Sequence, residues 1–324
     1  MRPSHSRSAR LGAVLLATTL LTACTAPSDD AAAAEDGTHR VDWGVFLPDD
    51  RAPSSDLRTV AQMAGSMPAY ILRFAGIDER TPIPELDGIV EAGAMPILTL
   101  EPWQPGMGPN QPAYALRRIA AGEFDTQLDS WAKNLAQWKQ PLIVRFGHEM
   151  NSDHYPWSVG VNGNTAADFV NAWHRVRERF TLQGASNATF MWCPDAPHDG
   201  STDMAAAFPG ADAVDVLGLD GYNWGFGDGH SWRQPEAVFA TGLDQLRALE
   251  GDHPILIGET ATVEGPQSGV DKAEWIERLF TFLSRQDQVD GVVWFQMVKE
   301  RDWRFNSSEQ SQTAFHDALA NRPT

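Results

Sequence analysis

The chain has 324 residues, 42% of them hydrophobic, and carries a formal net charge of −18 at pH 7. This length and composition predict a packed globular core in one large α/β domain or two ordinary domains. The 43 acidic residues outnumber the 25 Lys and Arg. Because this excess would repel a phosphate backbone and no basic patch offsets it, the composition argues against nucleic acid as a partner.

The first 23 residues have the features of an export signal. Three arginines precede the apolar stretch at residues 11–23, which has the length of a signal-peptide core and is short for a membrane-spanning helix. Cys24 closes the sequence LTAC, which resembles a bacterial lipobox; an ordinary signal peptide is the alternative. Residues 24–40 are then a lipidated N-terminus and flexible linker, and this anchor alone would hold the protein on the extracytoplasmic face of the cell membrane. With Cys24 lipidated, Cys193 would have no disulfide partner.

From residue 41 onward, apolar runs alternate with amphipathic segments. Most of these runs are continuous, which is typical of strands buried on both faces of a parallel sheet. The eight predicted strands are residues 41–47, 69–76, 95–103, 141–149, 188–195, 214–223, 254–261 and 291–297. Helical patterns lie between them, such as residues 165–180, which begin with Thr165, a residue type that favours the N-cap position.

Eight successive strand-then-helix units predict a single (β/α)8 TIM barrel spanning residues 41–324, in the α/β class. A doubly wound open sheet is the alternative fold. It is disfavoured because no Gly-rich phosphate-binding loop follows any of the predicted strands.

Polar and aromatic side chains gather where the apolar runs stop. They are Glu101, Trp103, His148, Glu149, Asp195, Tyr222, Asn223, Glu259 and Gln296. Because the active sites of TIM barrels lie at the carboxyl ends of the strands, these residues predict one shared cleft. The chain also has 12 Trp against only 4 Tyr, which indicates that some indole rings line this cleft, where they could stack on sugar rings.

Two glutamates at the strand ends can be paired by their chemistry. Glu149 ends the fourth predicted strand and Glu259 ends the seventh, so a closed barrel would place them across its mouth. Glycoside hydrolysis uses such a pair, in which one carboxylic acid protonates the leaving oxygen while the other group, as a carboxylate, attacks the anomeric carbon. Taken singly, each glutamate would normally be a surface or capping carboxylate, but both lie at the ends of buried strands and near aromatic residues, which favours the catalytic interpretation.

Five motifs together resemble glycoside hydrolase family 26, whose members are retaining, endo-acting (β/α)8 enzymes best known as β-mannanases. The motifs are RFGHEMN…YPW, LGLDGYNW, ILIGET, VVWFQM and LTLEPW, and the resemblance runs from about Val41 to the end of the chain. It implies that Glu149 is the general acid and base and that Glu259 is the nucleophile. It also implies a hydrogen bond from Tyr222 to the nucleophile.

The resemblance further assigns substrate-binding roles. His148 and Asn151 would position a sugar, Trp157 and Trp294 would form sugar platforms, and Trp103 would line the same cleft. Burial of Glu149 near aromatic rings would raise its pKa, and a Tyr222 hydroxyl would stabilise the ionised form of Glu259. For Arg145, Asp195 and Asp220, structural and catalytic roles are both open.

The chain also departs from the usual family pattern. Ser152 stands where many members have Gly, and His154 stands where they have Trp, which affects substrate preference more than reaction type. A zinc-protease site is not supported, because the residue four positions after His148 is Ser152. We therefore expect no metal and no cofactor.

Several alternatives remain open for the function. β-1,4-Mannan is the first expectation for the substrate, with mixed-linkage β-1,3/1,4-glucan and xylan as alternatives within the family. A protein of another class, a non-catalytic lipid-anchored glycan-binding module, would also use a Trp-lined cleft, although both catalytic glutamates are present.

Overall fold

The computed structural model describes residues 37–48, 55–266 and 271–323. Eight parallel strands form a closed barrel in chain order, so the predicted fold is confirmed. The strands are β1 (Asp42–Phe46), β2 (Tyr70–Gly76), β3 (Met95–Glu101), β4 (Leu142–Phe146), β5 (Ala188–Trp192), β6 (Val216–Asn223), β7 (Ile255–Thr262) and β8 (Val289–Phe295). β1 pairs with β8 from Asp42↔Gly291 to Phe46↔Phe295, which closes the ring.

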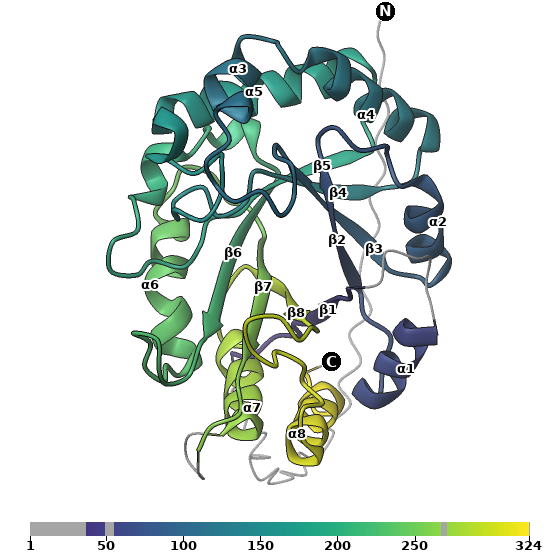
Figure 1. The fold of residues 1–324 in the computed structure, drawn as a ribbon. Coiled ribbons are helices and arrows are strands. Elements are labelled where there is room, and N and C mark those ends of the chain that lie inside the picture. Colours follow the sequence, from purple (N-terminus) through teal and green to yellow (C-terminus); the bar gives the residue numbers. More distant parts are fainter. Residues whose placement is uncertain (1–36, 49–54, 267–270, 324) are drawn as a thin grey trace, which may run out of the picture. The chain divides into compact units, whose positions relative to one another are not determined.

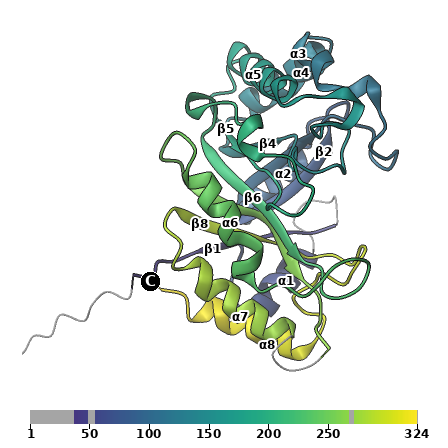
Figure 2. The same cartoon turned by 90° about the vertical axis from the view of Figure 1, so that its left-hand side faces the viewer.

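Helices surround the barrel (Figure 1). They are α1 (Ser55–Ala64), α2 (Ile83–Glu91), α3 (Leu116–Ala120), α4 (Asp125–Trp138), α5 (Ala166–Leu182), α6 (Pro235–Arg247), α7 (Lys272–Leu283) and α8 (Glu309–Ala320). The last two helices lie side by side, as both views show (Figures 1 and 2). Thr165 caps α5 as predicted: its side chain accepts a hydrogen bond from the backbone of Asp168, whose side chain bonds back to Thr165.

The core has two parts. A small cluster fills the barrel, and it consists of Leu72, Ile97, Ile143, Met191, Cys193, Val216, Leu256 and Val293. A larger cluster packs the outer faces of the strands against the helices. Burial on both faces explains why the strands read as continuous apolar runs rather than alternating ones.

Several strand boundaries differ from those predicted, and two of them lie at the glutamates. β4 ends at Phe146 rather than at residue 149, because Gly147 and Glu149 adopt positive φ angles of 55° and 52° that a strand cannot contain. β7 runs to Thr262, one residue beyond the predicted end, so Glu259 lies within the strand. A register shift between Leu219 and Asp220 of β6 then places Asp220 directly beside Glu259.

The predicted signal peptide and lipidated residue, Cys24, lie outside the described residues. None of the helices in the described ranges is long and apolar enough to span a membrane. Cys193, the other cysteine, is a buried free thiol.

Candidate active site

A cavity of about 600 Å³ opens at the carboxyl ends of the strands. It brings together Glu149 and Glu259, as the sequence predicted, with Tyr222 and Trp103 on its walls. The remaining lining residues are Phe46, Phe74, Glu101, His154, Tyr155, Asp195, Trp224, Phe295, Met297, Lys299, Glu300 and Trp303. Six of the strands contribute residues to this cleft directly. The other two, β4 and β5, contribute through the loops that follow them.

Glu149 sits in the loop after β4, where its backbone is strained. A φ of 52° is uncommon for a residue with a side chain, and such strain is typical of functional sites. The backbone N–H of Glu149 donates to the carbonyl of Cys193 at 2.8 Å, which helps to fix this conformation. Only 9% of the residue is exposed. The turn therefore aims a nearly buried carboxyl group into the cleft.

The surroundings of Glu149 favour its protonated form. Burial is the main cause that raises its pKa well above the usual value, and the negative charges of Asp195, Asp220 and Glu259 raise it further. The direction is the one expected from the sequence, but neighbouring carboxylates contribute as well as the aromatic surroundings. Glu149 can therefore hold a proton at neutral pH, as a general acid must.

Glu259 has the opposite environment, because two donors hold its carboxylate. The Tyr222 hydroxyl donates to Oε2 at 2.7 Å, and Nη2 of Arg145 donates to Oε1. Arg145 is fully buried and also donates to Oδ2 of Asp220 at 2.8 Å and to Oγ1 of Thr99 at 2.8 Å. The cation and the hydroxyl together stabilise negative charge on Glu259 and fix its orientation. Arg145 thus both pairs with buried carboxylates and touches the predicted nucleophile.

The space for this arrangement depends on a glycine. A Cβ atom at Gly258 would lie 2.5 Å from Oδ1 of Asp220 and 2.8 Å from Sγ of Cys193. Since neither neighbour lies at the end of a long flexible side chain, any other residue at position 258 would displace Asp220. The glycine before Glu259 therefore permits the pairing of Asp220 with Arg145.

His148 and Asn151 lie behind the cleft, which corrects their prediction as sugar contacts. Each is 1% exposed, and neither lines the cavity. His148 Nε2 lies 3.2 Å from the hydroxyl of Tyr155, and burial lowers the pKa of His148 well below its usual value, so the ring is neutral. The Asn151 side chain bonds the backbone N–H and carbonyl of Asp195, both at 2.8 Å. Both residues support cleft residues instead of lining it.

Trp157 and Trp294 are also too deeply buried to serve as the predicted sugar platforms. Trp157 is 0% exposed, because the ring of Tyr155 stacks on it with centroids 4.4 Å apart. Trp294 is 1% exposed and packs among residues of the outer layer, including Phe315 at 5.3 Å. Side chains alternate along a strand, so Trp294 faces the helices while the next residue, Phe295, lines the cleft.

Other aromatic residues take the place of these two at the cleft. Tyr155, Trp224 and Trp303 line the cavity, and none of them was predicted as a site residue. Trp224 contacts Trp303 edge to face, with centroids 4.9 Å apart, and Trp303 lies 5.3 Å from Tyr222. Strand periodicity could have indicated Phe295, but nothing in the sequence marks Trp303, because its position depends on the path of a loop.

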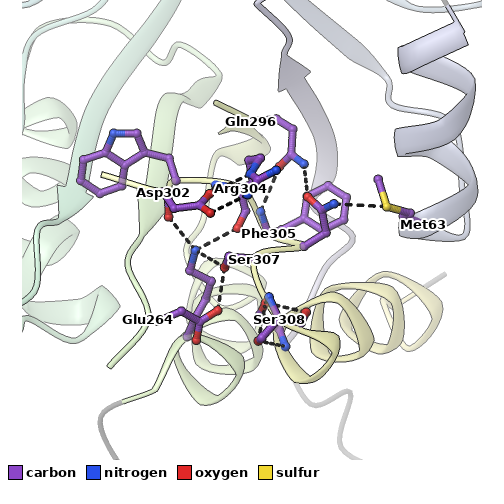
Figure 3. A network of polar contacts seen from close by, with 12 residues as sticks. Met63, Glu264, Gln296, Asp302, Arg304, Phe305, Ser307 and Ser308 are labelled. Atoms are coloured by element: carbon purple, nitrogen blue, oxygen red, sulfur yellow. Dashed lines mark hydrogen bonds and ion pairs between the residues drawn. The ribbon is translucent and has the colours of Figure 1, made fainter. Parts of the chain in front are cut away.

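The loop between β8 and α8, residues 296–308, carries Trp303 and is fixed by hydrogen bonds to a buried lysine. Lys272, the first residue of α7, is fully buried, and its Nζ donates to the carbonyls of Asp302 (2.9 Å) and Arg304 (2.8 Å) and to Oγ of Ser307 (2.7 Å). Ser307 in turn donates to Glu264, so the loop is joined to the end of β7 (Figure 3). Trp303, between two of these anchors, is therefore held firmly at the cleft.

The two departures from the family pattern have different positions. Ser152 is buried, and its Oγ lies 3.5 Å from that of Ser158, whereas His154 lines the cavity with 67% of its side chain exposed. A histidine ring thus stands at the rim where many family members have an indole. No group of three or more potential metal ligands occurs among the described residues.

A (β/α)8 barrel with two buried glutamates in one cleft, one favouring its proton and the other bonded by an arginine and a tyrosine, has the architecture of a glycoside hydrolase. Comparisons with known proteins agree. Residues 112–245 match the model of glycosyl hydrolase family 26. The chain is 29% identical over 242 residues to endoglucanase H of Acetivibrio thermocellus, a match that covers 73% of this chain and 25% of that protein. It is 28% identical over 183 residues to a mannan endo-1,4-beta-mannosidase of Bacillus subtilis, covering 55% and 44% of the two chains.

The chain is therefore similar to glycosyl hydrolase family 26, whose model its residues 112–245 match. It spans less than half the length of each of these curated relatives. Solved structures share the fold: the catalytic domain of a GH26 endo-beta-1,4-mannanase from Bacillus sp. JAMB-750 superimposes with a TM-score of 0.67 at 17% identity, covering 87% and 86% of the two chains. For the mannanase man26 of Bacillus subtilis, the TM-score is 0.64 at 17% identity, with the same coverage.

Proposed function

We propose that the protein is an endo-acting, retaining glycoside hydrolase that cleaves a β-linked polysaccharide. The first candidate for this polysaccharide is β-1,4-mannan. The observation that carries this proposal is the contrast between the two glutamates of the cleft. Burial and nearby carboxylates favour the proton on Glu149, while Arg145 and Tyr222 stabilise the ionised form of Glu259. These are the two states that double displacement requires.

The reaction follows from these states. Glu149 donates its proton to the glycosidic oxygen while Glu259 attacks the anomeric carbon, so that the glycosidic bond breaks and a glycosyl ester forms on Glu259. Glu149, now ionised, then takes a proton from water while the oxygen of that water attacks the anomeric carbon, which breaks the ester bond and releases Glu259 as a carboxylate. The sugar leaves with its original anomeric configuration, and both glutamates return to their starting states.

Mannan as the substrate is supported by the mannosidase relatives and by the mannanases that share the fold. A second candidate is a β-glucan, because the match to endoglucanase H covers more of the chain than the match to the mannosidase does. Endo action is supported by the cavity, which is built from the loops after several strands and can hold more than one sugar residue.

The proposed location is the extracytoplasmic face of a bacterial membrane, with the enzyme anchored through lipid on Cys24. The lipobox-like sequence LTAC supports this location. In cells expressing the full chain, we expect radiolabelled fatty acid to be incorporated and the protein to sediment with membranes. The Cys24→Ala variant should lose the label; equal labelling of both proteins would contradict the proposal.

The activity is tested by incubating the purified chain with β-mannan, mixed-linkage β-glucan and xylan side by side, with Glu259→Ala as the control. We expect a ladder of oligosaccharides from one polymer and none with the variant. Monosaccharide as the only early product would contradict endo action. Binding without release from any polymer would instead favour the non-catalytic glycan-binding alternative.

A further inference from the structure

A third carboxyl group, that of Glu101, lies in the cleft without a role in the reaction above. Glu101 is the last residue of β3 and is 6% exposed. It lines the catalytic cavity and also a neighbouring groove of about 1300 Å³ between β2, α2 and α4, so it stands where the two spaces meet. Phe74 is the other residue that lines both.

The hydrogen bonding of Glu101 is incomplete. Trp103 Nε1 donates to Oε2 at 3.1 Å, and within the described ranges this is the one side-chain hydrogen bond that Glu101 makes. No lysine or arginine of these ranges forms an ion pair with it, because the nearby Arg145 is committed to Asp220 and Glu259. The second oxygen, Oε1, makes no hydrogen bond to the described residues, so a ligand in the cleft could donate one to it.

The surroundings also decide the protonation state of Glu101. Burial is the main cause that raises its pKa to about 8, and the charges of Glu259 and Glu79 act in the same direction, whereas Trp103 and Arg145 lower it. At neutral pH the group is therefore a carboxylic acid. In this form it offers both a donor and an acceptor, which suits a sugar hydroxyl that can also donate and accept.

We propose that Glu101 binds a hydroxyl group of a sugar residue in the cleft through its free carboxyl oxygen and thereby contributes to substrate affinity. This inference rests on the proposed glycan-cleaving function and adds a binding contact to it. The position of the Glu101 carboxyl group is well defined. The Trp103 ring, which donates to its Oε2, packs edge-on against Tyr155, with centroids 5.7 Å apart. A sugar that passes Tyr155 toward the neighbouring groove would meet Oε1.

The test measures the dissociation constant of a hexasaccharide in a Glu149→Gln background, which removes turnover and the titration of the acid/base. The probes are hexasaccharides of β-1,4-mannan, mixed-linkage β-glucan and xylan, and the tightest is used. Glu101→Gln keeps a donor and an acceptor but cannot ionise, whereas Glu101→Leu keeps the approximate volume and loses both. At pH 6.5 we expect Glu101→Gln to bind within about threefold of the parent and Glu101→Leu about tenfold more weakly.

The pH dependence separates a binding role from a structural one. Between pH 6.5 and pH 9, ionisation of Glu101 should change the affinity of the parent several-fold, while the Glu101→Gln variant should not show this part of the change. Equal affinity of Glu101→Leu and the parent, or the same pH dependence with Glu101→Gln, would overturn the inference. If the wild-type chain also cleaves none of the three polymers, the proposed function fails; if it does cleave one, only the role of Glu101 fails.

Discussion

The hydrogen bond from Tyr222 to Glu259 gives the sharpest test of the catalytic geometry. Replacing Tyr222 by Phe removes one hydroxyl, which donates to the carboxylate at 2.7 Å, and keeps the ring that packs near Trp303. A hydrogen bond to a charged group contributes about 1.5–3 kcal/mol, which corresponds to roughly a 10- to 150-fold change in rate. Because Arg145 still holds the other oxygen of Glu259, we expect a loss in the lower part of this range, about 10- to 50-fold in kcat/KM.

The assay is the initial rate of oligosaccharide release from the polymer that the wild-type chain cleaves, with the melting temperature measured in parallel. Tyr155→Phe is a matched control, since its hydroxyl lies 3.2 Å from neutral His148 and is not hydrogen-bonded to a carboxylate. A bond between neutral groups contributes about 0.5–1.5 kcal/mol, so the control should lose less activity than Tyr222→Phe. A Tyr222→Phe enzyme with kcat/KM within twofold of wild type, and an unchanged melting temperature, would refute the reasoning.

Three further predictions concern the charges of the site. Glu149→Gln should lower kcat by about 10²- to 10⁴-fold, because it removes the general acid. The same variant should have a higher melting temperature at neutral pH. Folding raises the pKa of Glu149 above 4.5, so Glu149 destabilises the fold increasingly as the pH rises from that value, whereas Gln cannot ionise. Arg145→Met should destabilise the fold by about 3–5 kcal/mol in urea unfolding, since it leaves buried Asp220 and Glu259 without their cation. Lys272→Met should speed hydrogen exchange in the β8–α8 loop, which loses three hydrogen bonds.

Each of these predictions has an outcome that would contradict it. If the difference in melting temperature between Glu149→Gln and the wild type were the same at pH 5 and pH 8, the pKa of Glu149 would not be raised in the folded protein. An Arg145→Met protein as stable as wild type would mean that the buried carboxylates need no cation. For Lys272, the exposed Lys133 of α4 provides the control, and equal exchange in the loop for Lys272→Met and Lys133→Met would show that Lys272 does not fix it.

The barrel could be predicted from the sequence because its physical cause is local. Eight continuous apolar runs separated by amphipathic helices have few ways to bury all their surfaces, and a closed parallel barrel is one of them. The boundaries near the site were less predictable. The positive φ angle of Glu149 and the continuation of β7 past Glu259 both depend on neighbours contributed by other strands, such as Cys193 and Asp220.

The site could be predicted only in part, for a similar reason. Glu149 and Glu259 both line the predicted cleft, because Glu259 lies within β7 and Glu149 follows β4 by only three residues. Whether a given tryptophan lines the cleft was harder to predict, since a Trp beside a catalytic motif can face either the cleft or the core. Trp157 lies beneath Tyr155 and Trp294 faces the helices, so their exposure depends on packing that the linear sequence does not display.

The central claim is that Glu259 attacks the sugar and that Glu149 supplies and recovers the proton. The most direct test is to measure the anomeric configuration of the first products. Proton NMR can record it during the first minutes of hydrolysis, before mutarotation. Double displacement predicts that the β-configuration of the cleaved bond is retained in the product, and that Glu259→Ala abolishes its formation. Products that first appear in the α-configuration would show inversion, and would mean that Glu259 activates water instead of forming a covalent bond to the sugar.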